Sequence, residues 1–104
     1  MKKIYHKLVR DKIPEIIELS GNRCVTERLS EEAYLRALDE KLDEELAEYQ
    51  QSKSLEELAD LLEVMGAVVK ARGSSWEELE RIRKEKCAAR GAFDQRILLK
   101  EVIE

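Results

Sequence analysis

Two pairs of acidic residues stand at helical spacing in the stretch KLDEELAEYQQSKSLEELAD, residues 41–60. Glu45 precedes Glu48 by three positions, and Glu57 precedes Asp60 by the same step. Residues three apart lie on one face of a helix, so each pair would present two carboxylates side by side. Such carboxylates can bind a divalent cation or form a solvated acidic surface. The spacing alone favours neither, because a chain with 23 acidic residues contains several such pairs by chance.

The helix face on which the first pair lies is more informative than its spacing. Apolar residues recur there at three- and four-residue steps: Leu35, Leu38, Leu42 and Tyr49. Glu45 takes the position missing from this stripe, and Glu48 lies at the edge of the stripe. A buried, ionised carboxylate must pair with a cation, take up a proton or bind a metal. The sequence therefore predicts that Glu45 has one of these three fates.

The following segment is predicted to be a helix with two apolar faces. The first face carries Leu55, Leu58, Leu62, Met65 and Val69, and the second carries Leu61, Val64, Ala67, Val68 and Ala71. Glu57 and Asp60 lie at the N-terminal end of the second face. Four carboxylates from neighbouring helices would repel one another unless a divalent cation such as Mg²⁺ or Mn²⁺ neutralised them. We expect the first face to pack on the chain's own core and the second to pack against another copy of the chain.

Three ordinary roles compete with a metal site. Glu57 is the third residue after Ser54, so it could reach back as the glutamate of a capping box. Glu48 could form an ion pair on the helix surface. Both acidic pairs could also belong to a salt-bridged helical core, which the periodicity favours as much as a metal site.

The elements that would position these side chains are mostly helical, because one proline and four glycines separate segments rich in Leu, Glu, Ala, Lys and Arg. Pro14 suits the first turn of a short helix that ends at Gly21, and residues 22–29 are expected to form a loop. Three serines suit N-cap positions: Ser30, Ser54 and Ser75. They predict helices over about residues 31–51, 55–72 and 76–90.

Two further local patterns carry structural expectations. The sequence SWEE, from Ser75 to Glu78, matches a capping box. The tail RILLKEVIE, residues 96–104, is predicted to be a short β-strand that pairs with KKIYH near the N-terminus, with a last helical turn as the alternative. The fold expected from the sequence is all-α, with this strand as its only addition.

Length and charge narrow the possible functions. A chain of 104 residues should form one small domain, residues 1–104, with a thin core to which a second copy would add. The formal net charge is −4, and 23 acidic and 19 basic residues are spread along the chain. This balance argues against binding a nucleic-acid polymer through bulk charge. Any binding of phosphate must therefore use local basic residues.

Cysteine usage and hydropathy indicate an intracellular protein. Cys24 and Cys87 lack CxxC spacing, and with His6 alone they cannot complete an ordinary zinc site, so we expect both to be small buried hydrophobes. The N-terminal stretch has a charged residue every few positions, which is unlike a signal peptide, and no apolar run approaches a membrane span. The expected location is the cytoplasm.

The acidic stretch resembles a known signature. The sequence EELAE at 44–48, followed by ELAD at 57–60, is similar to the EExxE…ExxD pattern of the all-α nucleoside triphosphate pyrophosphohydrolases, the MazG-like superfamily. YHKLVRDKIPEII at 5–17, RGAF at 90–93 and RILL at 96–99 resemble a branch of short, phosphoribosyl-ATP pyrophosphohydrolase-like members. The resemblance spans nearly the whole chain, and the LVRDKIP opening makes it specific.

The resemblance implies a four-helix, oligomeric fold and a Mg²⁺-dependent hydrolysis at the α-phosphorus of a nucleotide, which releases a monophosphate and pyrophosphate. The implied metal ligands are Glu45, Glu48, Glu57 and Asp60, whereas the helical wheel turns Glu44 away. Glu45 or Glu48 would also orient the attacking water, and Lys41 lies one turn before Glu45 on the same side. Homodimers and homotetramers are both compatible with the resemblance.

Local basic residues are the candidates for phosphate contact in such a reaction. The stronger ones are Arg10 and Lys12 of LVRDK, and the weaker ones are Lys86, Arg90 and Arg96. For each of them a solvated or ion-paired role is at least as well supported, and Asp11 could serve only to orient Arg10.

Three functional hypotheses follow from the resemblance. The first is removal of non-canonical nucleoside triphosphates. The second is hydrolysis of phosphoribosyl-ATP in histidine biosynthesis, which shares the fold and the chemistry. The third is a helical interaction module without turnover. Several aromatic side chains could stack on a base, but an aromatic at helical spacing is more often part of a core, so the sequence does not select the base.

Overall fold

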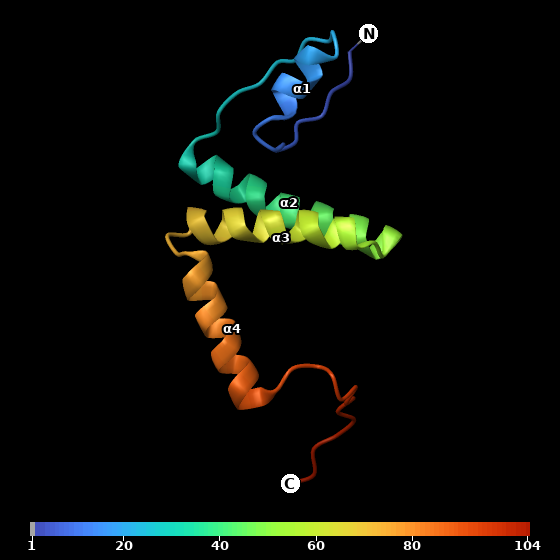
Figure 1. Ribbon diagram of the computed structural model, residues 1–104, viewed down its shortest axis with the longest axis vertical. Helices are drawn as coiled ribbons and strands as arrows, with labels where there is room; N and C mark the ends of the chain where they lie inside the picture. Colours follow the sequence, from blue (N-terminus) through green and yellow to red (C-terminus); the bar gives the residue numbers. More distant parts are fainter. Residues whose placement is uncertain (1) are drawn as a thin grey trace.

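The structure is a computed structural model that describes residues 2–104, and these residues form an all-α fold as the sequence predicts. The chain folds into four helices: α1 (Ile13–Leu19), α2 (Glu31–Ser52), α3 (Leu55–Ala71) and α4 (Trp76–Arg90). In Figure 1, α2 and α3 lie side by side at the middle of the molecule. The N-terminal segment and α1 lie on one side of this pair, and α4 and the tail lead away on the other.

The three long helices begin where their serines predict. The hydroxyl of Ser30 accepts the Ala33 N–H at 3.2 Å, and Ser54 accepts the Glu57 N–H at 3.3 Å. Ser75 forms the equivalent bond at the start of α4. These bonds satisfy backbone donors that have no partner within the helix. The capping box predicted from Ser75 to Glu78 is only half formed. The Ser75 hydroxyl takes part, but the Glu78 carboxylate accepts hydrogen bonds from Arg81 instead of from the Ser75 N–H.

The turn between α2 and α3 contains only two residues. Lys53 ends α2 in the left-handed region, with φ 56°, and its N–H donates to the Tyr49 carbonyl at 2.7 Å. Ser54 then begins the next helix. A turn this short forces α2 and α3 to pack antiparallel as a helical hairpin, which brings Glu45 and Glu48 close to Glu57 and Asp60.

The core of the chain lies within this hairpin. Leu38 is 2% exposed and Glu45 is 7% exposed, and these are the two buried side chains among residues 2–104. The other members of the predicted stripe on α2 are half-buried: Leu35, Leu42 and Tyr49. The predicted stripe is thus confirmed, including the glutamate that interrupts it.

The prediction for the two faces of α3 is wrong. The second face packs within the chain, since Leu61, Val64 and Val68 are half-buried. The first face is open over most of its length, with exposures of 81% for Leu55, 40% for Leu58, 51% for Leu62 and 38% for Met65, and only its last member, Val69, is half-buried. Both faces are apolar enough to pack, and the choice between them depends on the approach of α2, which the periodicity of α3 does not encode.

The predicted C-terminal strand is also wrong. Residues 97–104 adopt no regular structure, and residues 2–104 contain no strand with which the KKIYH segment could pair. The tail is fully exposed, including Ile97 at 84% and Ile103 at 90%. The prediction that both cysteines are buried is wrong, because Cys24 is half-buried and Cys87, on α4, is exposed.

The described chain exposes far more surface than a compact protein of its mass. Its accessible area is 10065 Å², whereas a folded 12.1-kDa monomer exposes about 6,000 Å². Its radius of gyration is 18.5 Å, compared with about 13 Å for a compact chain of this length. About 4,000 Å² of surface therefore lacks the cover that a globular fold normally provides.

Because the core is so small, we expect stability to depend strongly on Leu38. Leu38→Ala should lower the free energy of unfolding by about 2–5 kcal/mol, since it removes the one buried apolar side chain of residues 2–104. The matched control is Leu46→Ala on the same helix, where the side chain is 45% exposed and the expected loss is below about 1 kcal/mol. Urea denaturation followed by circular dichroism measures both. Equal losses in the two variants would contradict this location of the core.

Candidate metal centre

Three carboxylates converge inside the α2–α3 hairpin. Glu45 comes from α2, and Glu57 and Asp60 come from the first turns of α3. One carboxylate oxygen from each lies within 4.8 Å of the other two. Oxygens on opposite sides of a bound Mg²⁺ are about 4.2 Å apart. Small side-chain rotations would therefore bring the three oxygens into contact with one ion.

Two buried oxygens of this cluster have no hydrogen-bond partner within residues 2–104. They are Glu45 Oε2 and Glu57 Oε2. The nearest cation to Glu45 is Lys41, whose Nζ lies 3.6 Å from the other oxygen, Oε1. A buried polar atom without a partner is costly, and hard oxygen donors suit Mg²⁺ or Mn²⁺. The residues present therefore fit a divalent cation better than they fit a completed salt bridge.

The electrostatics of the cluster point the same way. Burial raises the pKa of Glu45, and the negative charges of Glu48 and Asp60 raise it further against the opposing effect of Lys41. Burial and the charges of Glu48 and Asp60 also raise the pKa of Glu57. Two acids with raised pKa values beside each other indicate negative charge that the chain itself does not neutralise.

Cations lie at the margin of the cluster. The Nη2 atom of Arg10 is 2.7 Å from Asp60 Oδ1, and Lys7 Nζ is 3.0 Å from Glu44 Oε1. Lys41 also binds Glu44, at 3.2 Å. Although burial opposes it, hydrogen bonds from Lys7 and Lys41 lower the pKa of Glu44. Glu44 is thus neutralised by lysines, in contrast to Glu45.

The structure excludes two of the ordinary roles that compete with a metal site. Glu57 does not complete a capping box, because the Ser54 N–H donates to the Ser52 hydroxyl at 3.2 Å. Glu48 forms no ion pair with residues 2–104; its side chain is exposed and lies outside the group of three converging oxygens. Its charge nevertheless acts on both Glu45 and Glu57. Glu48 is therefore at the rim of the site and stays a predicted ligand.

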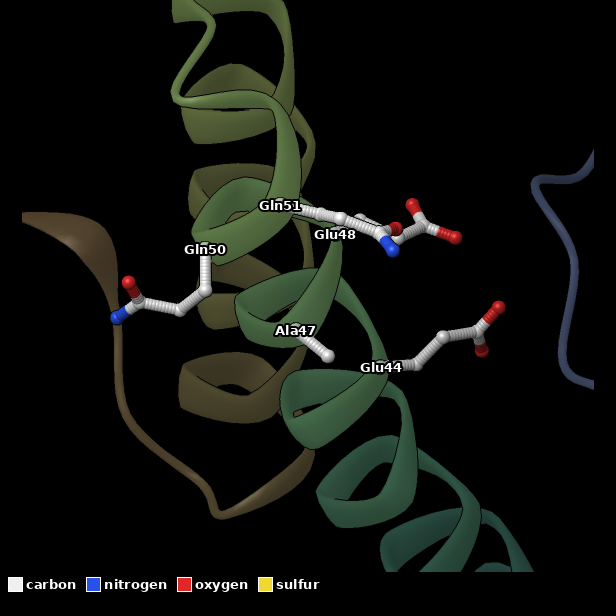
Figure 2. A pocket seen from close by; sticks show the side chains of 5 residues that line it. All are labelled: Glu44, Ala47, Glu48, Gln50 and Gln51. Carbon is white, nitrogen blue, oxygen red and sulfur yellow. The ribbon is translucent and has the colours of Figure 1, made fainter.

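An open depression adjoins the rim on the outer side of α2 (Figure 2). Its lining residues are Glu44, Ala47, Glu48, Gln50 and Gln51. Figure 2 shows the Glu44, Glu48 and Gln51 side chains pointing to one side of the helix, the side on which the N-terminal segment passes, while Gln50 points the other way. The depression is therefore bordered by the acidic rim and by a basic segment.

The predicted phosphate-binding residues are divided between two regions. Arg10 reaches the cluster, and it pairs with Asp60 rather than with Asp11. Lys12 is exposed at the N-cap of α1. The weaker candidates lie elsewhere: Lys86 and Arg90 are on α4, which leads away from the α2–α3 pair (Figure 1), and Arg96 shares a second depression with Arg90. The fold of one chain does not bring these three residues to the acidic cluster, and their roles stay predictions.

Sequence reasoning missed Lys7. Its ion pair with Glu44 spans 37 positions, so no local pattern in either helix indicates it. The available signal was the three-residue step between Lys7 and Arg10 within HKLVRDK, opposite a strongly acidic stretch.

Comparisons with known proteins add little to this site. A stretch of 42 residues is 57% identical to part of an uncharacterized protein of Mycolicibacterium smegmatis, and it covers 40% of this chain and 43% of that protein. The matching stretch thus spans less than half of the relative. No family model matches the chain, and no solved structure matches it. No helix within residues 2–104 has the length and apolarity needed to cross a bilayer.

We expect Glu45→Gln to raise the free energy of unfolding of the metal-free protein by about 1 kcal/mol, because it removes a buried, repelled charge. The folded-state pKa of Glu45 lies above its ordinary value. Ionisation of this group therefore lowers the free energy of unfolding of the wild type as the pH rises through that pKa. The gain in stability from Glu45→Gln should then be largest at neutral pH. Chemical denaturation at pH 4 and pH 7.5, without divalent ions, measures the effect.

Glu44→Gln is the matched control on the adjacent residue. It removes a carboxylate that two lysines neutralise, so it should destabilise the protein slightly. In the wild type, Mg²⁺ should raise the melting temperature at neutral pH, and Glu45→Gln should abolish that rise while Glu44→Gln keeps it. A stabilised Glu44→Gln, or a destabilised Glu45→Gln, would contradict this distribution of charge.

Proposed function

We propose that this protein is a Mg²⁺-dependent nucleotide pyrophosphohydrolase that cleaves a nucleoside triphosphate to a monophosphate and pyrophosphate. One observation carries the proposal: Glu45, Glu57 and Asp60 converge within 4.8 Å while buried oxygens of Glu45 and Glu57 lack partners. These are three of the four ligands that the EExxE…ExxD resemblance implies. Phosphate anhydride cleavage depends on cations that neutralise the charge of the transition state.

A divalent cation held by these carboxylates would polarise a phosphoryl oxygen and lower the pKa of a bound water. The chain's own residues would supply the remaining functions. Glu48 is exposed beside the cluster, where a free carboxylate can accept a proton from an attacking water. Lys7, Arg10 and Lys41 border the same cluster and can contact the phosphate oxygens.

The nucleotide would lie across the depression on the outer side of α2. The depression has a volume of about 450 Å³ and adjoins Glu44 and Glu48, which is within the usual range of about 300–1,000 Å³ for ligand sites. The Gln51 amide, which lies on the same side of the helix as Glu44 and Glu48, can both donate and accept hydrogen bonds with a base or sugar. The same chemistry accommodates removal of non-canonical nucleotides and, as the second candidate, hydrolysis of phosphoribosyl-ATP.

Purified protein should release pyrophosphate, and not orthophosphate, from a nucleoside triphosphate or from phosphoribosyl-ATP when Mg²⁺ is present. Glu45→Gln and Asp60→Asn should each lower kcat by at least about 100-fold, because each removes an oxygen from the cation site. A pyrophosphate assay with chromatography of the nucleotide product measures both. Orthophosphate as the primary product, or unchanged turnover in both variants, would disprove the mechanism. Absence of turnover on every substrate would favour the helical interaction module.

We further propose that the protein is a homo-oligomer, most simply a homodimer, held through the exposed first face of α3. The excess of about 4,000 Å² per chain exceeds the roughly 1,000–2,500 Å² that each partner buries in an obligate homodimer. The exposed stripe of Leu55, Leu58, Leu62 and Met65 runs along one side of α3. A stripe of this kind is typical of a subunit interface rather than of a free surface.

Leu58→Glu combined with Leu62→Glu should shift the protein from oligomer to monomer, because the two charges would be buried at the contact. Sedimentation velocity measures the change. The comparison variant is Val64→Glu, on the half-buried opposite face, which should unfold the hairpin instead. A wild-type chain that sediments as a stable monomer would refute the oligomer, and an unchanged oligomer in the double variant would place the contact elsewhere.

A further inference from the structure

The N-terminal segment is attached to the acidic hairpin by two ion pairs three residues apart. Lys7 binds Glu44 of α2, and Arg10 binds Asp60 of α3. Residues 2–10 form neither helix nor strand, and all of them except the half-buried Leu8 are exposed. These side-chain contacts therefore contribute much of what holds the segment at the mouth of the site.

The two ion pairs differ in the carboxylate that they engage. Glu44 lies outside the three converging oxygens and is shared by Lys7 and Lys41. Asp60 is a member of the three, so Arg10 places a positive charge directly on a carboxylate of the cation site. A divalent ion and a guanidinium at the same carboxylate repel each other. Binding of one must weaken binding of the other.

We propose that Arg10 is a displaceable occupant of the cation site: it binds Asp60 while the site lacks a divalent ion, and it is released when the ion binds. The inference rests on the proposed function, and it assigns a regulation to that site. Binding of the ion would raise the fraction of molecules in which Arg10 is free, and the free guanidinium could then contact a phosphate of the nucleotide.

The strength of the contact suits such an exchange. The Arg10 and Asp60 side chains are 56% and 41% exposed, and an ion pair this open shifts an equilibrium by no more than about fivefold. A divalent ion would in addition satisfy the buried, unpaired oxygens of Glu45 and Glu57. The ion should therefore displace Arg10 from Asp60, and the competition should lower the apparent affinity of the site for the ion only slightly. Lys7 would remain on Glu44, so the released Arg10 would stay near the rim.

The first test is the affinity of the protein for Mn²⁺ alone, measured by electron paramagnetic resonance of the free ion. Arg10→Gln should bind Mn²⁺ about two- to fivefold more tightly than the wild type, because the competitor is gone. Lys7→Gln is the matched control, since it removes the same charge from the same segment but leaves the contact to Asp60. It should change the affinity by less than Arg10→Gln does.

The outcomes separate this inference from the proposed function. If the wild type binds no Mn²⁺, both the proposed function and the exchange fail. If the wild type binds Mn²⁺ and both variants bind it more tightly by the same factor, the increase comes from the general loss of a positive charge. That result would refute the exchange but would leave the cation site in place. A weaker affinity in Arg10→Gln would also refute the exchange.

The second test follows the Arg10 side chain itself by ¹⁵N relaxation of its Nε–H group, without nucleotide. The signal is identified by its absence from the Arg10→Gln spectrum. Mg²⁺ should make it as mobile as the Nε–H of Arg28, which forms no ion pair with residues 2–104. Saturation with Mg²⁺ that leaves Arg10 as rigid as before would overturn the proposal even if the affinities change as expected.

Discussion

The burial of Glu45 between α2 and α3 is the constraint on which the rest of the site depends. This side chain occupies a position at which the helix pattern predicts an apolar residue. It lies one turn before Tyr49 and two turns after Leu38 along α2. The hairpin packs only if a carboxylate enters its interior, next to two others from α3. Repulsion among the three opposes the packing that the leucines and valines favour. The metal-free hairpin therefore contains opposing interactions around Glu45, which is 7% exposed.

The arrangement of charge around Glu45 is a consequence of these opposing interactions. The basic residues that approach the cluster do so from its margin: Lys7, Arg10 and Lys41. Lys41 reaches Oε1 of Glu45 at 3.6 Å, but no cation of residues 2–104 pairs with the buried Oε2. An acidic centre with a basic rim suits a cation and a polyphosphate together. A salt-bridged core would instead place the opposite charges in contact throughout.

Helix bounds and the α2 stripe could be predicted from the sequence because their causes are local. Serine caps, glycine ends and three- to four-residue spacing act within one helix, and the observed helices begin at the predicted residues. The proximity of Glu45 to Glu57 and Asp60 could be predicted because the short turn sets the end of α2 antiparallel to the start of α3, although Glu48 lies outside the group of three. The Arg10–Asp60 pair spans 50 positions and depends on the path of an irregular segment, so no local pattern contains it.

The face of α3 that packs inward could not be predicted for a different reason. Leu58 and Leu62 on one face are as apolar as Leu61 and Val64 on the other, so the hydrophobic effect alone does not choose between them. The capping-box alternative for Glu57 is excluded because the neighbouring Ser52 hydroxyl accepts the Ser54 N–H. In both cases two interactions of similar strength compete. Such competition is decided by geometry that the sequence does not express.

The corrected orientation of α3 changes how an oligomer would act on the site. Glu57 and Asp60 face α2, whereas Leu58, Leu62 and Met65 lie on the exposed side of the same helix. A second copy bound to that side would cover the back of the helix that carries two of the three converging carboxylates. Its influence on the site would then be to hold α3 against α2 in spite of the repulsion among these carboxylates. Assembly and cation binding would stabilise the same helix pair from opposite faces, and each would strengthen the other through linkage.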